Sequence, residues 1–339
     1  MKYIFPFYSH LTFYMSLEII RHYDIPLADC LMISGRNYAI PTEDKPSECQ
    51  FLFFKGGWND KRYRMFSGLK IWKTIKNRNN FDKLIFDNTQ GDKYQCFLGS
   101  CADDLANLLV THKNCTGYYI YEEGMASYNP NIPPIFSGPR HLIFKCFLKP
   151  FFPRFYSIKE YNIYPFYYKF KKFIAISPRC FPTFDEYEKV IVNYPFKPHT
   201  LNFVPDVIMS IDPVSSFIDK DAAIDIYLHL LNYINKRNYK KIAYKFHPWF
   251  YIHPEETKEY QQLITTILGN NAIELHENII LERVLTTYKC DFYTGYCSSV
   301  CIYGAFAGAK CYLATPLLKK YNISFDNLPL KDMLNDIDI

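Results

Sequence analysis

The chain has 339 residues, 49% of them apolar, and a formal net charge of +5, which is the profile of a globular protein long enough for two domains of ordinary size. Charged residues make up 22%, so the composition excludes an intrinsically disordered chain. The mild positive charge suits an anionic ligand or surface. The basic residues are dispersed, which argues against a nucleic-acid binder.

The 11 cysteines include no CxxC pair, and their spacing resembles no zinc site. Thiols such as Cys30, Cys290 and Cys311 stand in apolar runs, as expected of small buried hydrophobes in a reducing compartment. Pro6 and the polar residues after it interrupt the first apolar run too early for a secretion signal. No window offers the roughly 18 apolar residues of a spanning helix. We therefore expect a cytoplasmic protein.

In the first 200 residues, short apolar runs alternate with helical patterns. This alternation predicts a mostly parallel sheet covered on both faces. The expected strands are Lys2–Phe5, Ala28–Ser34, Lys83–Phe86, Tyr94–Leu98, Gly117–Tyr121 and, as the last of this half, Phe173–Ser177. The expected helices are Leu11–Arg21, Arg62–Lys76 and Cys101–His112, the last of them capped by Ser100.

We expect a domain boundary near residue 200, dividing the chain into residues 1–200 and 201–339. Beyond it, strands and helices alternate in a Rossmann-like pattern without a GxGxxG fingerprint. The expected strands are Lys241–Phe246, Ala272–Leu275, Cys290–Thr294 and, as the last of the chain, Cys311–Ala314. One expected helix follows a cap at Asp221, and three others begin near Pro254, Ile279 and Ser298-Ser299.

The first of three short motifs is Glu122-Glu123-Gly124, directly after the apolar run GYYIY. The carboxyl ends of strands in open α/β sheets are where ligands bind. Because successive strand side chains point to opposite sides, only one of the two carboxylates can face a given cleft. A carboxylate fixed there suits a general base, and Gly124 permits a sharp turn. The plain alternative is an acidic turn.

The other two motifs lie in the second half. His247-Pro248 ends a strand abruptly and places an imidazole at the sheet edge, since proline cannot continue the ladder. Ser298-Ser299 opens a helix just after Gly295, where hydroxyls and free N–H groups can hold a phosphate. Glu274 lies on the strand between these motifs. The plain alternatives are a histidine at a strand end, a serine N-cap and a solvent-facing strand residue.

Taken together and in this order, the motifs resemble the (Asp/Glu)-(Asp/Glu)-Gly, His-Pro and Ser-(Ser/Thr) motifs of bacterial sialyltransferases, which include glycosyltransferase families 52, 38 and 80. The resemblance lies in the arrangement of the two halves and in the order of the motifs, and this arrangement spans most of the chain. It implies the α/β fold called GT-B, with two Rossmann-like domains facing each other across a cleft. The form Lys-Gly-His-Pro common in these enzymes is Lys245-Phe246-His247-Pro248 here, so a phenylalanine replaces a glycine that would let the backbone approach the nucleotide.

The resemblance implies an inverting transferase that moves sialic acid from CMP-sialic acid to a hydroxyl of a surface glycan such as lipooligosaccharide or capsule. Glu123 would be the general base, with Glu122 and Gly124 as the rest of its motif. His247 would stabilise or protonate the leaving phosphate. We expect no metal or other cofactor, because histidine, hydroxyls and a helix dipole can stabilise a single phosphate.

The resemblance also implies the donor contacts. Ser298 and Ser299 would hold the phosphate of CMP, Lys245 and Pro248 would lie against the cytidine, and Glu274 would take the ribose hydroxyls. Two other functions stay open: a GT-B transferase with a UDP- or GDP-sugar or another CMP-activated acid as donor, and a non-catalytic glycan- or membrane-binding protein of the same fold. The acceptor, the linkage and the oligomeric state stay open as well.

Residues 140–172 mix aromatic and basic side chains and are interrupted by prolines. This composition suits peripheral contact with the anionic inner face of the cytoplasmic membrane. A loop packed on its own domain and a contact between subunits are equal alternatives.

Overall fold

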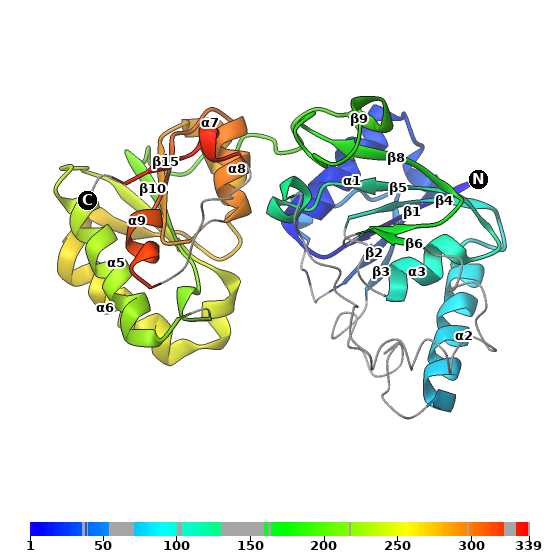
Figure 1. The fold of residues 1–339 in the computed structure, drawn as a ribbon, viewed down its shortest axis with the longest axis horizontal. Helices are drawn as coiled ribbons and strands as arrows, with labels where there is room; N and C mark the ends of the chain where they lie inside the picture. Colours follow the sequence, from blue (N-terminus) through cyan, green and yellow to red (C-terminus); the bar gives the residue numbers. More distant parts are fainter. Residues whose placement is uncertain are drawn as a thin grey trace. The chain divides into compact units, whose positions relative to one another are not determined.

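The structure, a computed structural model, describes residues 1–35, 38, 40–53, 71–99, 104–129, 159–161, 164–216, 218–296, 298–321 and 330–337. The chain divides into two compact units, Met1–Pro195 and Phe196–Ile339, close to the boundary expected near residue 200. Each unit is built on a parallel sheet with helices, as the alternation of strands and helices predicts (Figure 1).

The first unit holds a 7-stranded parallel sheet in the order β3-β2-β1-β4-β5-β8-β9. Its strands are β1 (Lys2–Phe7), β2 (Cys30–Ser34), β3 (Gln50–Phe53), β4 (Tyr94–Leu98), β5 (Cys115–Tyr121), β8 (Phe170–Ala175) and β9 (Lys189–Ile191). Its helices are α1 (His10–His22), α2 (Ile71–Asn88) and α3 (Asp104–Thr111), and β6 (Lys159–Tyr161) pairs with β7 (Tyr164–Phe166) in a separate antiparallel hairpin.

The strand predicted at Lys83–Phe86 is wrong, because these residues belong to α2. Asn77, Phe81 and Ile85 are buried at intervals of one helical turn, whereas Phe86 is exposed. A four-residue apolar run fits a strand and a helix equally well, and only the pattern over a longer stretch of sequence distinguishes them.

The expected helix Arg62–Lys76 overlaps α2 from Ile71 onward, and its earlier residues lie outside the described ranges, as does the cap predicted at Ser100. Phe173–Ser177 is not the last strand of this half, because β9 follows it.

The second unit holds a 6-stranded parallel sheet in the order β12-β11-β10-β13-β14-β15. Its strands are β10 (Val207–Ile211), β11 (Ile242–Phe246), β12 (Ala272–Glu274), β13 (Asp291–Thr294), β14 (Cys311–Leu313) and β15 (Asn335–Asp336). Its helices are α5 (Lys220–Asn235), α6 (Pro254–Leu268), α7 (Leu281–Tyr288), α8 (Ser299–Phe306) and α9 (Thr315–Lys319). This is the Rossmann order, in which the sheet grows first to one side of β10 and then to the other.

The sequence patterns missed the central strand of this unit. All five residues of β10 are buried, yet the run is short and lies between Pro205 and Pro213, so it resembles a linker. The cap of α5 is Asp219 rather than Asp221, since the Asp219 carboxylate accepts from the Ala222 N–H at 3.0 Å. The last strand is β15 rather than the one at Cys311.

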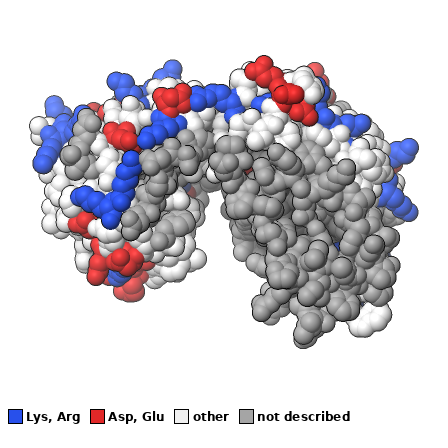
Figure 2. Space-filling view, viewed as in Figure 1, with Lys and Arg blue, Asp and Glu red and all other residues white. Residues whose placement is uncertain are grey.

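The described surface mixes charges of both signs. On the face shown in Figure 2, Lys and Arg are interspersed with Asp and Glu. No helix in the described ranges is both long and apolar enough to cross a bilayer. Of the aromatic-basic segment at residues 140–172, the part up to residue 158 lies outside the described residues, so the membrane contact stays a prediction.

The described cysteines carry free thiols, and most of them are buried. Cys30 and Cys311 are buried, as expected of small hydrophobes in a core, whereas Cys290 is half-buried.

Candidate active site

The acidic pair follows β5 at the carboxyl edge of the first sheet. Glu122 is fully buried, and its Oε2 accepts from the backbone N–H of Ile176 at 2.9 Å and from the Tyr128 hydroxyl at 3.2 Å. Because Ile176 directly follows β8, the Glu122 carboxylate ties the end of β5 to the end of the neighbouring strand. Its hydrogen bonds therefore serve the fold.

Glu123 has a different environment, as the alternation of side chains predicts. Its side chain is half-buried, and its backbone N–H donates to Ser127 Oγ at 2.9 Å. Gly124 adopts φ 106° and ψ −153°, a conformation that essentially only glycine tolerates. This turn leaves Glu123 as the more accessible carboxylate of the pair.

Further polar groups stand at the same edge of the first sheet, where the strand order reverses between β1 and β4. Ser9 caps α1 and forms a capping box with Thr12. His10 begins α1, and its Nδ1 lies 2.6 Å from the Tyr38 hydroxyl. Sequence reasoning did not single out these residues. The signal that could have found them is a Ser-His pair between an apolar strand and a helix.

In the second unit, His247 lies at the carboxyl edge of the sheet directly after β11. Its backbone N–H donates to the Ile211 carbonyl at 2.9 Å, which ties it to the end of β10. The imidazole is exposed, and its Nδ1 accepts from the Trp249 N–H at 3.2 Å. A neutral ring that accepts at Nδ1 carries its hydrogen on Nε2, so Nε2 is the nitrogen that can donate to a ligand.

Asp212 is the residue of this edge that sequence reasoning missed. It directly follows β10, is 5% exposed, and its Oδ2 accepts from Ser210 Oγ at 2.8 Å and from Thr294 Oγ1. Burial raises the pKa of the Asp212 carboxyl, while the two hydroxyls and the nearby His247 act in the opposite direction. The available signal was two polar residues, Ser210 and Asp212, at the end of an apolar run.

The turn after β13 completes the edge. A Cβ atom at Gly295 would lie 2.6 Å from Tyr227 Cζ, so only glycine lets the backbone pass this buried ring. Ser298 caps α8, with its Oγ accepting from the Val300 N–H at 3.3 Å, and Ser299 is the first helical residue. Both serines are half-buried. Hydroxyls and the N–H groups of a first helical turn thus stand together, as an anion site requires.

The register of the sheet brings these groups close to one another. Ile211 of β10 lies opposite Phe246 of β11, and Ser210 lies opposite Thr294 of β13. His247, Asp212 and the turn after Thr294 are therefore at the ends of three adjacent strands. They flank the point where the strand order reverses, between β10 and β13, which is where open α/β sheets bind ligands.

The structure shows the surroundings of the three remaining residues that were predicted to contact the donor. Lys245 is buried, its Nζ donates to the Ile279 carbonyl, and burial lowers its pKa. Glu274 is exposed on the edge strand β12, where its Oε2 accepts from Tyr244 Oη at 3.1 Å and Gln261 Nε2 at 3.0 Å. Pro248 is exposed directly after His247. Their roles as donor contacts stay predictions.

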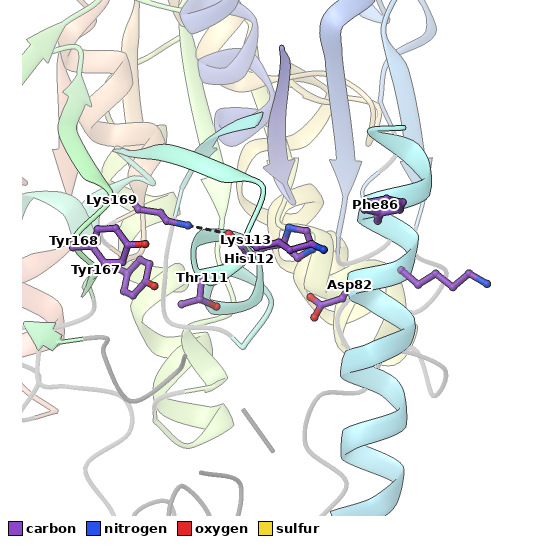
Figure 3. A pocket seen from close by; sticks show the side chains of 9 residues that line it. Asp82, Phe86, Thr111, His112, Lys113, Tyr167, Tyr168 and Lys169 are labelled. Carbon is purple, nitrogen blue, oxygen red and sulfur yellow. Dashed lines mark hydrogen bonds between the residues drawn. The ribbon is translucent and has the colours of Figure 1, made fainter. Parts of the chain in front are cut away.

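A hollow of about 810 Å³ lies elsewhere in the first unit, at the amino ends of β5 and β8 (Figure 3). Its lining includes Asp82, His112, Lys113 and Lys169. Lys169 Nζ donates to the His112 carbonyl at 3.0 Å, just beyond the end of α3. A lysine at a helix C-terminus complements the helix dipole. This lysine therefore has a structural role, and the hollow lies at the opposite sheet edge from Glu123.

The comparisons with known proteins identify the fold. No family model and no curated protein matches the sequence. The chain is similar to the structure of a variant of Os79 from O. sativa in complex with UDP, with a TM-score of 0.57 and 10% identity over 100% of this chain and 87% of that one. It is also similar to UDP-GlcNAc 2-epimerase from Methanocaldococcus jannaschii in complex with UDP-GlcNAc and UDP, with a TM-score of 0.51 and 13% identity over 92% and 83% of the two chains. The chain has the GT-B fold.

Proposed function

We propose that this protein is an inverting GT-B glycosyltransferase that moves sialic acid from CMP-sialic acid to a hydroxyl of a surface glycan. The observation that carries the proposal is the group of polar residues at the reversal point of the second sheet. There an imidazole, a buried carboxylate and a serine-capped helix N-terminus meet at the ends of adjacent strands. This set suits one phosphate that becomes more negative as it leaves.

In the proposed reaction, Glu123 takes the proton of the acceptor hydroxyl as its oxygen attacks the anomeric carbon of sialic acid. The bond between that carbon and the phosphate oxygen breaks, and its electron pair leaves with CMP. His247 stabilises the departing phosphate through a hydrogen bond from Nε2 or, when its ring is protonated, donates the Nε2 proton to it, and Ser298 and Ser299 bind its oxygens. A base on one face and leaving-group stabilisation on the other give inversion.

A UDP-sugar donor is the second candidate, because both of the similar structures contain UDP. The two donors make different demands on the site. A diphosphate is commonly bridged by a divalent cation held by carboxylates. In the described ranges, no three His, Cys, Asp or Glu side chains are grouped so that they could hold a metal ion. The metal-independent reaction that we propose predicts activity in the presence of a chelator.

The donor is tested by the melting temperature of the protein with CMP, UDP or GDP in excess chelator. A ligand at 100 times its Kd stabilises the folded state by about 2.7 kcal/mol. We expect CMP to raise the Tm clearly and UDP and GDP to raise it much less. Cytidine, which lacks the phosphate, is the matched control and should shift the Tm less than CMP. A shift with UDP that equals or exceeds the shift with CMP would contradict the proposal.

A further inference from the structure

Asp212 is a buried carboxylate for which the proposed reaction assigns no role. Its Oδ2 accepts hydrogen bonds from Ser210 and Thr294. Its Oδ1 makes no hydrogen bond to any residue that the structure describes, and it is not among the fully buried unsatisfied atoms. Hydrogen bonds from two hydroxyls favour the ionised carboxylate and offset part of the cost of burial. Burial raises the pKa of the Asp212 carboxyl, and the hydrogen bonds from Thr294 and Ser210 are the largest effects that favour its negative charge at this sheet edge.

The charges around His247 show what this carboxylate acts on. Although His247 is an exposed residue, its ring is partly desolvated by the protein around it, and this desolvation lowers the pKa of the imidazole below its ordinary value; Asp212 raises the pKa and so offsets part of this effect, and Lys245 lowers it further. Asp212 approaches from the neighbouring strand β10, and Lys245 belongs to β11 itself. From α5, the Tyr227 hydroxyl bonds only the backbone of Asp212, accepting from its N–H at 2.6 Å and donating to its carbonyl at 3.1 Å.

The turn after β13 faces the same edge with the neutral hydroxyls of Thr294 and Ser298. Asp212 is thus the one anion, in the described ranges, that acts on His247 against the effects of burial and Lys245. Without this carboxylate the pKa of the imidazole would be lower still, and a smaller fraction of the rings would carry a proton to give to the phosphate.

We propose that Asp212 is a positioning residue of the donor site, whose carboxylate keeps His247 able to hold a proton beside the departing phosphate. The inference rests on the proposed function for the identity of the leaving group. The step starts from the protonated ring, which carries hydrogens on both nitrogens and does not accept from the Trp249 N–H. As the bond to the sugar breaks, the proton on Nε2 passes to a phosphate oxygen, and the ring is left neutral with its hydrogen on Nδ1. Asp212 keeps its charge and transfers nothing.

The test is the pKa of His247, measured by NMR titration of the ligand-free protein, with His247→Gln to assign its signal among the 9 histidines. An anion a few ångströms away raises such a pKa by about 1–3 units. We expect Asp212→Asn to lower the pKa of His247 by about one unit. Tyr227→Phe is the matched control: it removes hydrogen bonds to Asp212 but no charge, so it should lower the Tm and leave this pKa within a few tenths of a unit.

An unchanged pKa in Asp212→Asn, or an equal shift in Tyr227→Phe, would overturn the inference. If Asp212→Asn does not fold, Thr294→Val removes one hydroxyl that stabilises the carboxylate. It should lower the pKa of His247 by a smaller amount, and an unchanged or higher pKa would count against the role of Asp212.

The pH dependence of transfer separates this inference from the proposed function. Above the pKa of His247, each unit by which that pKa falls reduces the protonated fraction tenfold. At such a pH, kcat/KM of Asp212→Asn should therefore be about tenfold lower than that of the unchanged protein. The alkaline limb of its pH profile should move to lower pH by as many units as the pKa of His247 falls. A pKa shift in a protein that transfers no sugar would defeat the proposed function and leave the coupling intact. If Asp212→Asn transfers sugar and the alkaline limb of its pH profile is not displaced, the inference about Asp212 is contradicted and the proposed function is not.

Discussion

Glu122 and Glu123 are adjacent in sequence, but their carboxylates lie in different surroundings. Glu122 is buried and accepts from Ile176 and Tyr128, whereas Glu123 is half-buried at the sheet edge. Alternation along a strand predicts this difference. It does not predict which of the two is buried, because that depends on how β8 pairs with β5.

Replacing Glu123 with glutamine removes the basic carboxylate and preserves its size. A general base typically contributes about 10²–10⁴-fold to the rate, so we expect turnover of Glu123→Gln to fall by about that factor. The Tm shift caused by CMP should survive, because Glu123 belongs to the other unit from the proposed phosphate contacts. Initial rates and thermal denaturation of the same preparation measure the two effects.

Glu122→Gln is the matched control at the neighbouring position. An amide accepts more weakly than a carboxylate, and its NH2 group needs a new partner in a buried site. The loss of free energy of unfolding should be about 1–3 kcal/mol, seen as a lower Tm. If Glu122→Gln is stable and inactive while Glu123→Gln keeps its turnover, the assignment within the pair is reversed.

At the scale of elements, the donor edge depends on how closely the turn after β13 approaches α5. Gly295 lies against the ring of Tyr227, which is buried and whose hydroxyl binds the backbone of Asp212. One glycine therefore links the packing of α5 to the position of the Asp212 carboxylate and of the turn that leads to Ser298.

The change Gly295→Ala tests this packing. The new Cβ would lie 2.6 Å from Tyr227 Cζ, and overpacking of this kind costs about 1–3 kcal/mol. We expect a lower Tm and a weaker response to CMP, since the turn must move. The control is Gly117→Ala, where the new Cβ would approach the flexible side chain of Lys171 at 2.8 Å. A Gly295→Ala protein as stable as Gly117→Ala would show that the turn is not constrained by Tyr227.

Strands and helices with a clear hydrophobic pattern and clear turn or cap residues at their ends could be predicted from the sequence, whereas short strands could not. The expected strand at Lys241–Phe246 and the helix opened by Ser298-Ser299 correspond to β11 and α8. The strand β10 is bounded by prolines on both sides and was not predicted from the sequence, so Asp212 was missed with it. The edge strands β9 and β15 are 3 and 2 residues long and carry no period that a sequence pattern can show.

At the scale of the whole molecule, the alternation of strands and helices was enough to predict two parallel α/β units, and the similar structures identify the GT-B fold. The ligand could not be predicted in the same way. It depends on side chains at strand ends, whose neighbours are set by strand order: Asp212 meets His247 and Thr294 only because β10 lies between β11 and β13. That order is a property of the sheet and leaves no mark in the local sequence.

Transfer measured across a panel of nucleotide sugars tests the proposed reaction most directly. The panel should include CMP-sialic acid and representative UDP- and GDP-sugars, in excess chelator, with hydrolysis of the donor recorded alongside transfer. We predict turnover of CMP-sialic acid alone, and its loss by about 10²–10⁴-fold in Glu123→Gln. Turnover of a UDP-sugar in place of CMP-sialic acid would contradict the proposed donor, and turnover of no donor by a protein that still binds CMP would contradict the proposal that it is an enzyme.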